Sequence, residues 1–335
     1  MNVNLLLTLT ITTVLITGLA MPAFAMTSAD RDGPLTAPQA ITPPQPCVGG
    51  ETDLLIQDIV PWFAGAGQDP RGAFVNELIA QQKKWCSIGS DQIGATNLSL
   101  FKVIILASDQ PQTFYNNIMP GGVIHPAIDT WVKAGGVLSA SMADQGFNGG
   151  NWTPLTFIGG VKHALAFSQT NTIVDASHPL ITAAGLVCPS GNCAPIADNT
   201  GTCNDIDNCN WSNHGYFTSL PTGTNVIMTQ PDDNADGADE PVVIQFSHGS
   251  GVVIANTLTD AWRYVGGPGV TNLKFIANDI AYQNGFKTGQ IGGELLPIDS
   301  TALFISGLYG SIMWLAPVGA GIAGAGYYIV QRLYR

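Results

Sequence analysis

The sequence has 335 residues, of which 11% are charged, and its formal net charge is −12. A chain of this length can bury a substantial core without support from disulfides. The acidic balance repels phosphate backbones, and no basic cluster with interleaved aromatic residues occurs, so composition argues against nucleic acid as a partner.

The first 25 residues have the features of a signal peptide. Residues 1–29 carry no charged side chain, residues 5–19 are apolar, and Ala23-Phe24-Ala25 supplies a small-x-small cleavage site. Because no Lys or Arg precedes the apolar run, an uncleaved anchor stays open as an alternative. Residues 26–50 follow as a linker rich in Pro and Thr.

Strands and helices alternate through the predicted domain, residues 51–287. Apolar runs predict buried parallel strands at 53–60, 101–107 and 137–141, with helices at 70–85 and 125–134 between them. Three later segments alternate around turns and predict an antiparallel extension, followed by a closing helix: 225–229, 241–247, 251–257 and 272–284. The sequence therefore predicts an α/β fold with a doubly wound, mostly parallel sheet.

A second uncharged apolar run, residues 300–331, follows a stalk at 288–299. At about 1.5 Å per residue this run exceeds the ~30 Å hydrocarbon core, so it predicts one C-terminal transmembrane helix. Arg332 and Arg335 come next, and positive charge predicts a cytoplasmic tail at 332–335 with an extracellular ectodomain, in a single-pass protein of the cell membrane. A GPI signal is the rival, which the terminal arginines disfavour.

Six cysteines in an exported chain predict three disulfides. The pairing that needs the fewest long connections joins Cys47 to Cys86, Cys188 to Cys193 and Cys203 to Cys209. A zinc site made from the four late cysteines is the alternative, although their spacings are not C-x₂-C.

Polar loops follow two of the predicted parallel strands. Residues 108–112 and 142–150 combine carboxylates, amides and glycines at the edge where ligands collect in a doubly wound sheet. We therefore expect a polar small molecule, glycan or peptide to bind there, through Asp109, Gln110, Asp144, Gln145 and Asn148, with His178 and His214. Turn formation and local hydrogen bonding, for these loops and for His163, are the simpler interpretation.

Several segments resemble, in their order, class I glutamine amidotransferase-like domains of the flavodoxin-like α/β superfamily. They are D-Q-P-Q-T-F-Y, W-V-K-A-G-G-V-L, A-S-H-P-L, H-G-Y-F and P-V-V-I-Q-F-S-H-G-S-G-V-V-I-A, and the resemblance spans roughly residues 53–285 as a divergent secreted member. The family's enzymes use a Cys at a strand-to-helix elbow, where this chain has Ala140-Ser141-Met142, and a His followed by an acid, where His248 precedes Gly249. Amidotransferase activity is therefore not implied.

A calcium site is predicted by the turn at residues 232–237. Asp232, Asn234 and Asp236 fit D-x-N-x-D-G, with Glu240, or Asp239 beside it, as a further oxygen ligand. Val243 stands at the twelfth position, where an EF-hand has Glu, so a solvated acidic turn is the alternative.

Three N-x-S/T sequons predict a glycoprotein, at Asn97, Asn151 and Asn210. The segment L-L-P-I-D-S-T-A-L-F-I-S-G resembles the anchors of archaeal surface proteins, especially those of ammonia-oxidising lineages.

Together these features predict a membrane-anchored extracellular module without catalysis, which binds a polar ligand or serves in an envelope assembly. The alternatives are a surface hydrolase that uses Ser141 or a metal, and a purely structural envelope protein.

Overall fold

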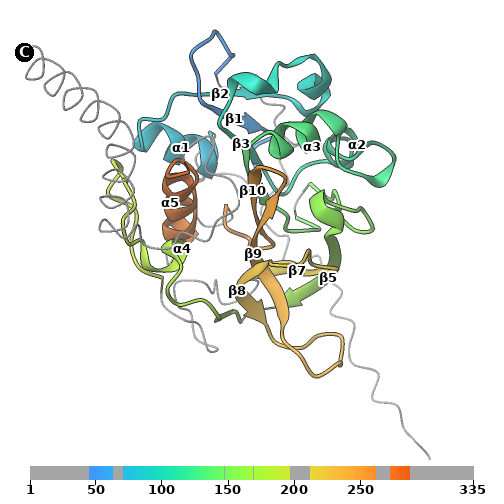
Figure 1. Ribbon diagram of the computed structural model, residues 1–335. Coiled ribbons are helices and arrows are strands. Elements are labelled where there is room, and N and C mark those ends of the chain that lie inside the picture. The colour runs from blue at the N-terminus through green and yellow to red at the C-terminus, as the bar shows by residue number, and fades with distance from the viewer. Residues whose placement is uncertain are drawn as a thin grey trace, which may run out of the picture.

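The computed structural model describes residues 45–62, 71–146, 148–168, 170–196, 212–261 and 272–286 (Figure 1). Its main sheet has eight strands in the order β2-β1-β3-β4-β10-β9-β8-β6. The strands are β1 (Asp53–Ile56), β2 (Trp85–Ile88), β3 (Val103–Leu106), β4 (Val137–Ser141), β6 (Thr172–Ile173), β8 (Asn225–Gln230), β9 (Glu240–His248) and β10 (Gly251–Asn256).

The sheet is mixed. Strands β2, β1, β3, β4 and β10 run parallel, whereas β9, β8 and β6 each run antiparallel to their neighbours. The parallel strands carry runs of buried aliphatic side chains, as strands covered on both faces require.

Helices cover both faces of the sheet (Figure 1). In β3, Ile104 and Leu106 belong to one core with the helices α2 and α3, while Val103 and Ile105 belong to a second core with α1, α4 and α5. The α-helices are α1 (Ala73–Ala80), α2 (Gln112–Ile118), α3 (Pro126–Lys133), α4 (Pro179–Thr182) and α5 (Asn272–Gln283). Short 3₁₀ helices lie at Ser90–Ala95, Leu98–Leu100, Pro120–Gly122 and Ile158–Gly160.

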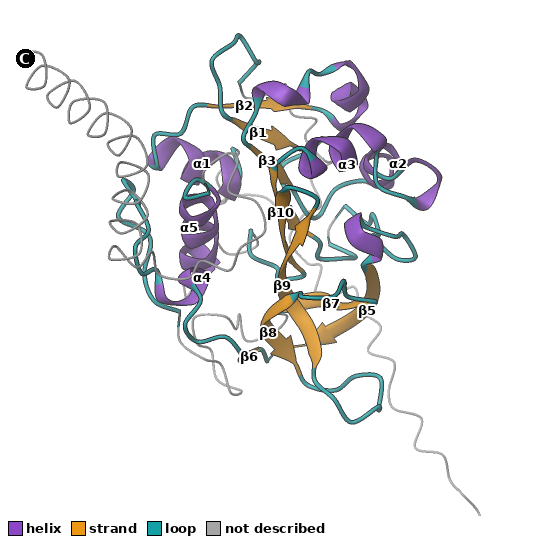
Figure 2. Ribbon diagram, in the orientation of Figure 1, coloured by secondary structure: helices purple, strands orange, loops and turns teal. Residues whose placement is uncertain are grey.

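A separate two-stranded sheet, β5 (Lys162–Ser168) and β7 (Asn213–Thr218), lies beside β9 (Figure 2). It is joined to the main sheet by backbone hydrogen bonds from His214 N to Thr257 O (2.9 Å) and from Asp144 N to His214 O (2.9 Å). The small sheet therefore lies against the loops that follow β4 and β10.

The predicted fold class included one C-terminal transmembrane helix, and the structure does not support that part of the prediction. No helix in the described ranges is long and apolar enough to cross a membrane. The longest of them, α5, has 12 residues, which is about 18 Å and well short of the ~30 Å hydrocarbon core. The fold class is a mixed α/β protein with an eight-stranded sheet, and the predicted single-pass membrane location is not supported. The predicted span at 300–331 lies outside the described residues, as do 1–25, 288–299 and 332–335.

Two predicted disulfides are confirmed, Cys47–Cys86 and Cys188–Cys193, while Cys203 and Cys209 lie outside the described residues. The zinc alternative loses two of its four ligands to the second bond.

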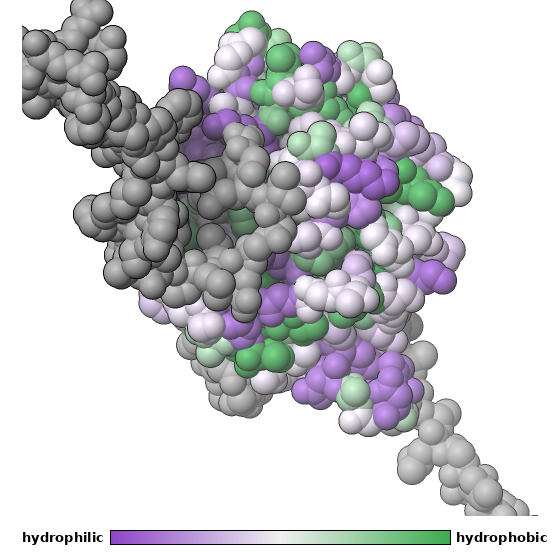
Figure 3. Space-filling view, in the orientation of Figure 1, coloured by the Kyte–Doolittle hydropathy of each residue, from purple (hydrophilic) through white to green (hydrophobic). Residues whose placement is uncertain are grey.

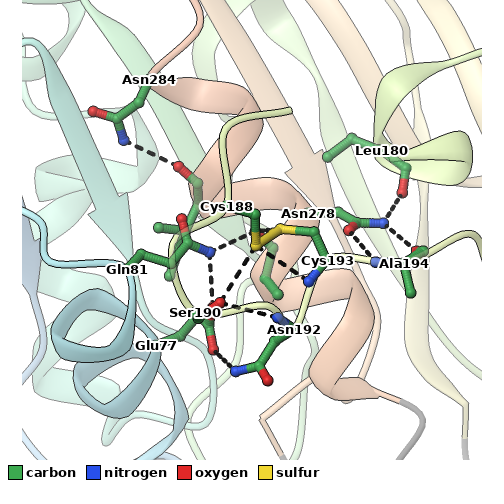
Figure 4. The surroundings of a disulfide bond; sticks show 12 residues. Glu77, Gln81, Leu180, Cys188, Ser190, Asn192, Cys193, Ala194, Asn278 and Asn284 are labelled. Atoms are coloured by element: carbon green, nitrogen blue, oxygen red, sulfur yellow. Dashed lines mark hydrogen bonds between the residues drawn. A yellow bond between two sulfur atoms is a disulfide. The ribbon is translucent and has the colours of Figure 1, made fainter. Parts of the chain in front are cut away.

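The loop closed by Cys188 and Cys193 has a structural role (Figure 4). Ser190 Oγ donates to Glu77 Oε1 at 2.7 Å, and Asn192 Nδ2 donates to Glu77 Oε2 at 2.9 Å. Glu77 lies on α1 with none of its surface exposed. The loop thus brings hydrogen-bond donors to a buried carboxylate, which would be costly to leave unpaired.

Candidate functional site

The loops that leave the parallel strands meet at one edge of the sheet, which we call the carboxyl edge. It comprises residues 57–62 after β1, 107–112 after β3, 142–146 and 148–150 after β4, and 257–259 after β10. From β1 the chain goes to β2, which lies on one side of β1, and then crosses to β3, which lies on the other side. A reversal of this kind is the place where ligands bind in doubly wound sheets.

Asp109 ties three of these loops together. Its Oδ1 accepts from Asn148 N at 3.0 Å, and its Oδ2 accepts from Asn148 Nδ2 at 2.9 Å and from Trp62 N. Only 1% of the residue is exposed, and this burial raises the pKa of its carboxyl to about 7. A Cβ on Gly146 would lie 2.0 Å from Asp109 Oδ1, so the loop after β4 can approach only because it has glycine there.

The side-chain carboxamide of Gln110 makes all of its hydrogen bonds with the surrounding backbone. Its Oε1 accepts from Asp58 N (2.7 Å) and Ile59 N (3.0 Å), and its Nε2 donates to Ser108 O (2.9 Å). The side chain is fully buried. Gln110 therefore shapes the edge, and its carboxamide has no atom left for a ligand.

Asp144 is held between the loop after β4 and the small sheet. Its Oδ1 accepts from Trp152 N, and its Oδ2 accepts from Thr153 N at 3.3 Å and lies 3.3 Å from His163 Nδ1. His214 Nδ1 donates to the main-chain oxygen of Asp144 at 2.6 Å. Burial raises the pKa of Asp144, and the charge of His163 opposes that shift.

Both histidines are buried and favour the neutral form. Burial lowers the pKa of His163, against the charge of Asp144, and lowers the pKa of His214 to about 4. The His214 ring packs edge-on against Trp62, with centroids 5.3 Å apart. The His163 ring occupies space that a Cβ on Gly215 would fill, only 2.1 Å away.

His163 is the residue that the predicted ligand set lacked. It lies on β5, seven residues long, whose partner strand is remote in sequence, so no local motif marks it.

Five carboxamides lie on α2 and in the segment after β4, next to this buried group, and we call them the carboxamide rim: Gln112, Asn116, Gln145, Asn148 and Asn151. They are exposed or half-buried. Gln112 Oε1 accepts from Asn151 N at 2.9 Å, which fastens the first turn of α2 to the loop after β4. Beneath the rim, Tyr115 and Trp152 pack edge-to-face with centroids 4.7 Å apart.

His178 lies elsewhere, on the face covered by α4 and α5. Its Nδ1 accepts from Leu180 N at 3.2 Å and caps α4, while its Nε2 lies 3.0 Å from Gln245 Oε1. The ring packs against Tyr282 of α5 at 5.0 Å. The structure therefore brings together the predicted residues at positions 109, 144, 148 and 214, and places His178 apart from them.

Ser141 faces the second core rather than the rim. Its Oγ donates to Asp260 Oδ2 at 3.0 Å and accepts from Asn256 Nδ2 at 3.4 Å. Within the described ranges no imidazole contacts this hydroxyl, and 1% of the residue is exposed. A serine nucleophile needs a base within hydrogen-bond reach.

Three of the four predicted calcium ligands lie on the hydrophilic loop between β8 and β9 (Figure 3), and Glu240 is the first residue of β9. Asp232 accepts from Ala235 N (2.7 Å) and Gly237 N (2.8 Å), and Asn234 accepts from Asp236 N (2.9 Å). Glu240 is 4% exposed and accepts from the loop backbone. In the part of the chain that the structure describes, no three acidic, Cys or His side chains are grouped to hold a metal. Calcium binding stays a prediction.

The sequons are placed differently. Asn97 is exposed at the start of a 3₁₀ helix, Asn151 belongs to the carboxamide rim, and Asn210 lies outside the described residues.

No family model matches the chain. A protein of Clostridium acetobutylicum, described as uncharacterized, is 28% identical over 207 residues, which cover 62% of this chain and 18% of that protein. The chain thus spans less than a fifth of the length of this relative.

Solved structures give low similarities. A cytoplasmic protein of Salmonella typhimurium LT2 aligns at 12% identity and a TM-score of 0.40, over 70% of this chain and 99% of that one. An exo-beta-1,4-mannosidase from Opitutaceae bacterium strain TAV5 aligns at 14% and 0.34, over 73% of this chain and 37% of the enzyme. A beta-galactosidase from Rahnella sp. R3 aligns at 15% and 0.36, over 70% and 32%. Scores this low carry no argument about function.

Proposed function

We propose that this protein is a non-catalytic, amidotransferase-like module that binds a neutral polar ligand, a glycan or a peptide, at the carboxamide rim. The ligand is either free or part of an envelope assembly. The observation that carries the proposal is the rim itself, which has five carboxamides at positions 112, 116, 145, 148 and 151. The buried residues beneath them are held in place by hydrogen bonds within the protein.

Carboxamides suit a neutral ligand because a carboxamide both donates and accepts hydrogen bonds. A sugar hydroxyl or a peptide group needs the same combination. Asn148 Nδ2 already donates to Asp109 and Asn151 Oδ1 is buried, so the ligand is met chiefly by Asn116 and Gln145. The rim has no charged member, so it offers no ion pair to an anionic or cationic ligand. Because Asp109 and Asp144 fix the loops beneath, little conformational freedom is lost on binding.

Binding is favoured over hydrolysis by the position of the reactive groups. Ser141 Oγ is bound to Asp260 in the second core, whereas His163 and His214 contact Asp144 at the carboxyl edge. Nucleophile and base therefore belong to different hydrogen-bond groups. The two disulfides fit an oxidising compartment, where free glycans and peptides are available.

The test measures binding by the full chain to an array of neutral oligosaccharides and short peptides, followed by titration calorimetry on the best probe. The double variant Asn116→Ala with Gln145→Ala should weaken that binding at least about tenfold, roughly 1.4 kcal/mol. Gln92→Ala is the matched control, since this exposed carboxamide lies on another surface segment. Equal affinity in the double variant would remove the rim as the site.

The hydrolase alternative has its own assay. Ammonia release from glutamine and hydrolysis of aryl esters are measured on the full chain, with Ser141→Ala as the comparison. We expect no turnover. Activity that disappears in Ser141→Ala would replace the binding proposal with a serine enzyme.

A further inference from the structure

The two sequons that the structure describes present their carboxamides in different ways. Asn97 is exposed, and its Oδ1 accepts from Ser99 Oγ at 2.7 Å and from Ser99 N at 3.2 Å. Its Nδ2 has no hydrogen-bond partner among the described residues. The hydroxyl and the backbone of the third sequon residue therefore hold the oxygen of the carboxamide, and the nitrogen stays accessible.

Asn151 is half-buried and its surroundings are occupied. Its backbone N donates to Gln112 Oε1 at 2.9 Å, and its backbone oxygen accepts from Gln112 Nε2 at 3.4 Å. Its Oδ1 is buried without a partner in the described part of the chain, so the hydroxyl of Thr153 does not engage it. Thr153 Oγ1 instead contacts His163 Nδ1 at 2.9 Å. The sequon at 151 thus lacks the hydroxyl contact that the sequon at 97 has.

We propose that Asn97 is an N-glycosylation acceptor, modified by an oligosaccharyltransferase that uses a lipid-diphosphate-linked oligosaccharide. In that transfer, Asn97 Nδ2 forms a bond to the anomeric carbon of the first sugar while the bond from that carbon to the diphosphate oxygen breaks. The lipid diphosphate leaves with the bonding electrons, and the proton lost from Nδ2 passes to a base of the transferase. No oxidant or reductant is needed.

Ser99 contributes in two ways. Its hydrogen bonds to Oδ1 fix one rotamer of the carboxamide, so less freedom is lost when a transferase engages it. They also draw electron density toward the oxygen, which makes the N–H bond of Asn97 more acidic and its proton easier to remove.

The folded surface accommodates a glycan at this position. Leu98 is 5% exposed and anchors the short helix in the core, whereas Leu100, two residues further along, is 64% exposed. A sugar on Asn97 would extend into solvent beside Leu100 and shield this apolar side chain from water. The carboxamide rim does not include Asn97, so this proposal is independent of the proposed function.

The test expresses the full chain, residues 1–335, in a host that has an oligosaccharyltransferase, and measures intact mass and glycopeptides by mass spectrometry. We expect one glycan mass on the peptide that contains Asn97. It should be absent from Asn97→Gln and Ser99→Ala, retained in Ser99→Thr, which keeps the hydroxyl, and retained in Asn151→Gln.

Two results would overturn the proposal. One is a glycan found on Asn151 or Asn210 but not on Asn97. The other is an unmodified chain in cells that glycosylate a secreted reporter sequon. Disulfide mapping of the same samples shows that each variant has reached the oxidising compartment, because Cys47–Cys86 must be formed there.

Discussion

The carboxyl edge and the region beneath α5 both bury two aspartates, but they satisfy them in different ways. At the edge, Asp109 and Asp144 accept backbone N–H groups with both carboxylate oxygens. Beneath α5, Asp279 Oδ2 accepts from Ser139 Oγ (2.7 Å) and Gln283 Nε2 (2.6 Å), while its Oδ1 has no partner among the described residues. The edge is built to hold loops, and the α5 region leaves a buried charge partly unpaired.

The two regions also differ in how protons are bound. Burial raises the pKa of Asp260 to about 7 and of Asp279 to about 6. A folded carboxyl with a raised pKa holds its proton longer than the unfolded chain does, so the free energy of unfolding falls as pH rises from about 4 to about 6 or 7. His163 and His214 have lowered pKa values, so their contribution falls instead as pH drops below about 6.5.

Where a buried acid lies beside buried histidines, their effects on the pH dependence of the free energy of unfolding partly cancel. At the carboxyl edge the raised pKa values of Asp109 and Asp144 and the lowered pKa values of the two histidines act in opposite directions. Around Asp260 and Asp279 the pKa values of both acids are raised, so the two shifts act in the same direction. Four substitutions or additions test this contrast.

The largest effect is expected for Asp109→Ala. The change removes the carboxylate that accepts three N–H groups, the buried Trp62 N and the half-buried Asn148 N and Asn148 Nδ2. At about 1–3 kcal/mol for each unsatisfied group, the free energy of unfolding should fall on the order of 4 kcal/mol, even though a buried charge is also removed. Urea unfolding at neutral pH measures it. A loss below about 1 kcal/mol would mean that Asp109 does not hold the loops.

Gly215→Ala should cost about 3 kcal/mol. The new methyl would lie 2.1 Å from the His163 ring, and φ at this position is +117°. Gly223→Ala is the matched control, because its φ is +82° with no atom within 4 Å of an added Cβ. Urea unfolding of both variants separates backbone strain from the displacement of His163. Equal losses in the two variants would show that the ring position does not matter.

Asp279→Asn should change how stability depends on pH beneath α5. The variant lacks the buried charge, so its stability relative to the unsubstituted protein should rise between about pH 4 and pH 6, by roughly 2 kcal/mol, and then level off. Unfolding is measured across that range, with exposed Asp91→Asn as a control that should show little change. A difference that is flat with pH would contradict the raised pKa of Asp279.

The smallest effect concerns carboxylates that are already in water. Calcium that binds the loop at 232–237 should raise the free energy of unfolding by about 1 kcal/mol at concentrations a few times the dissociation constant, and the melting temperature should rise with it. Differential scanning calorimetry measures the shift, and Asp232→Ala with Asp236→Ala should abolish it while Asp91→Ala should not. The same rise in the double variant would assign the loop to a solvated turn.

Most strands of the main sheet could be predicted from the sequence, because each is a short apolar or alternating run between turn residues. The predicted segments 101–107, 137–141 and 251–257 coincide with β3, β4 and β10. Strand β2 could not be predicted, because Trp85–Ile88 directly follows the helical pattern and mixes Cys and Ser with apolar residues. The strands β5 and β7 were not predicted because their pairing is remote in sequence. The hydrogen-bonded residues Ser168, at the end of β5, and Ser212, just before β7, are 44 positions apart.

The candidate site was predictable in position and less so in role. Asp109, Asp144 and Asn148 follow strands at a topological reversal, and general rules place ligands there. The sequence could not show that Gln110 is used up by the backbone of residues 58 and 59, since that contact depends on the spacing of β1 and β3. It also could not pair His163 with Gly215, which requires the register of the small sheet.

The first disulfide has a consequence for association between chains. Strand β2 is the outermost strand of the main sheet, and an uncovered edge strand offers its backbone to strands of other molecules. Here Ser87 N donates to Gln45 O at 2.9 Å, and Gln45 Nε2 donates to Trp85 O at 3.0 Å. Cys47–Cys86 locks that covering segment covalently beside the strand. Oxidation of this pair therefore keeps the edge strand covered and protects it against strand addition and aggregation, whereas reduction would weaken that protection.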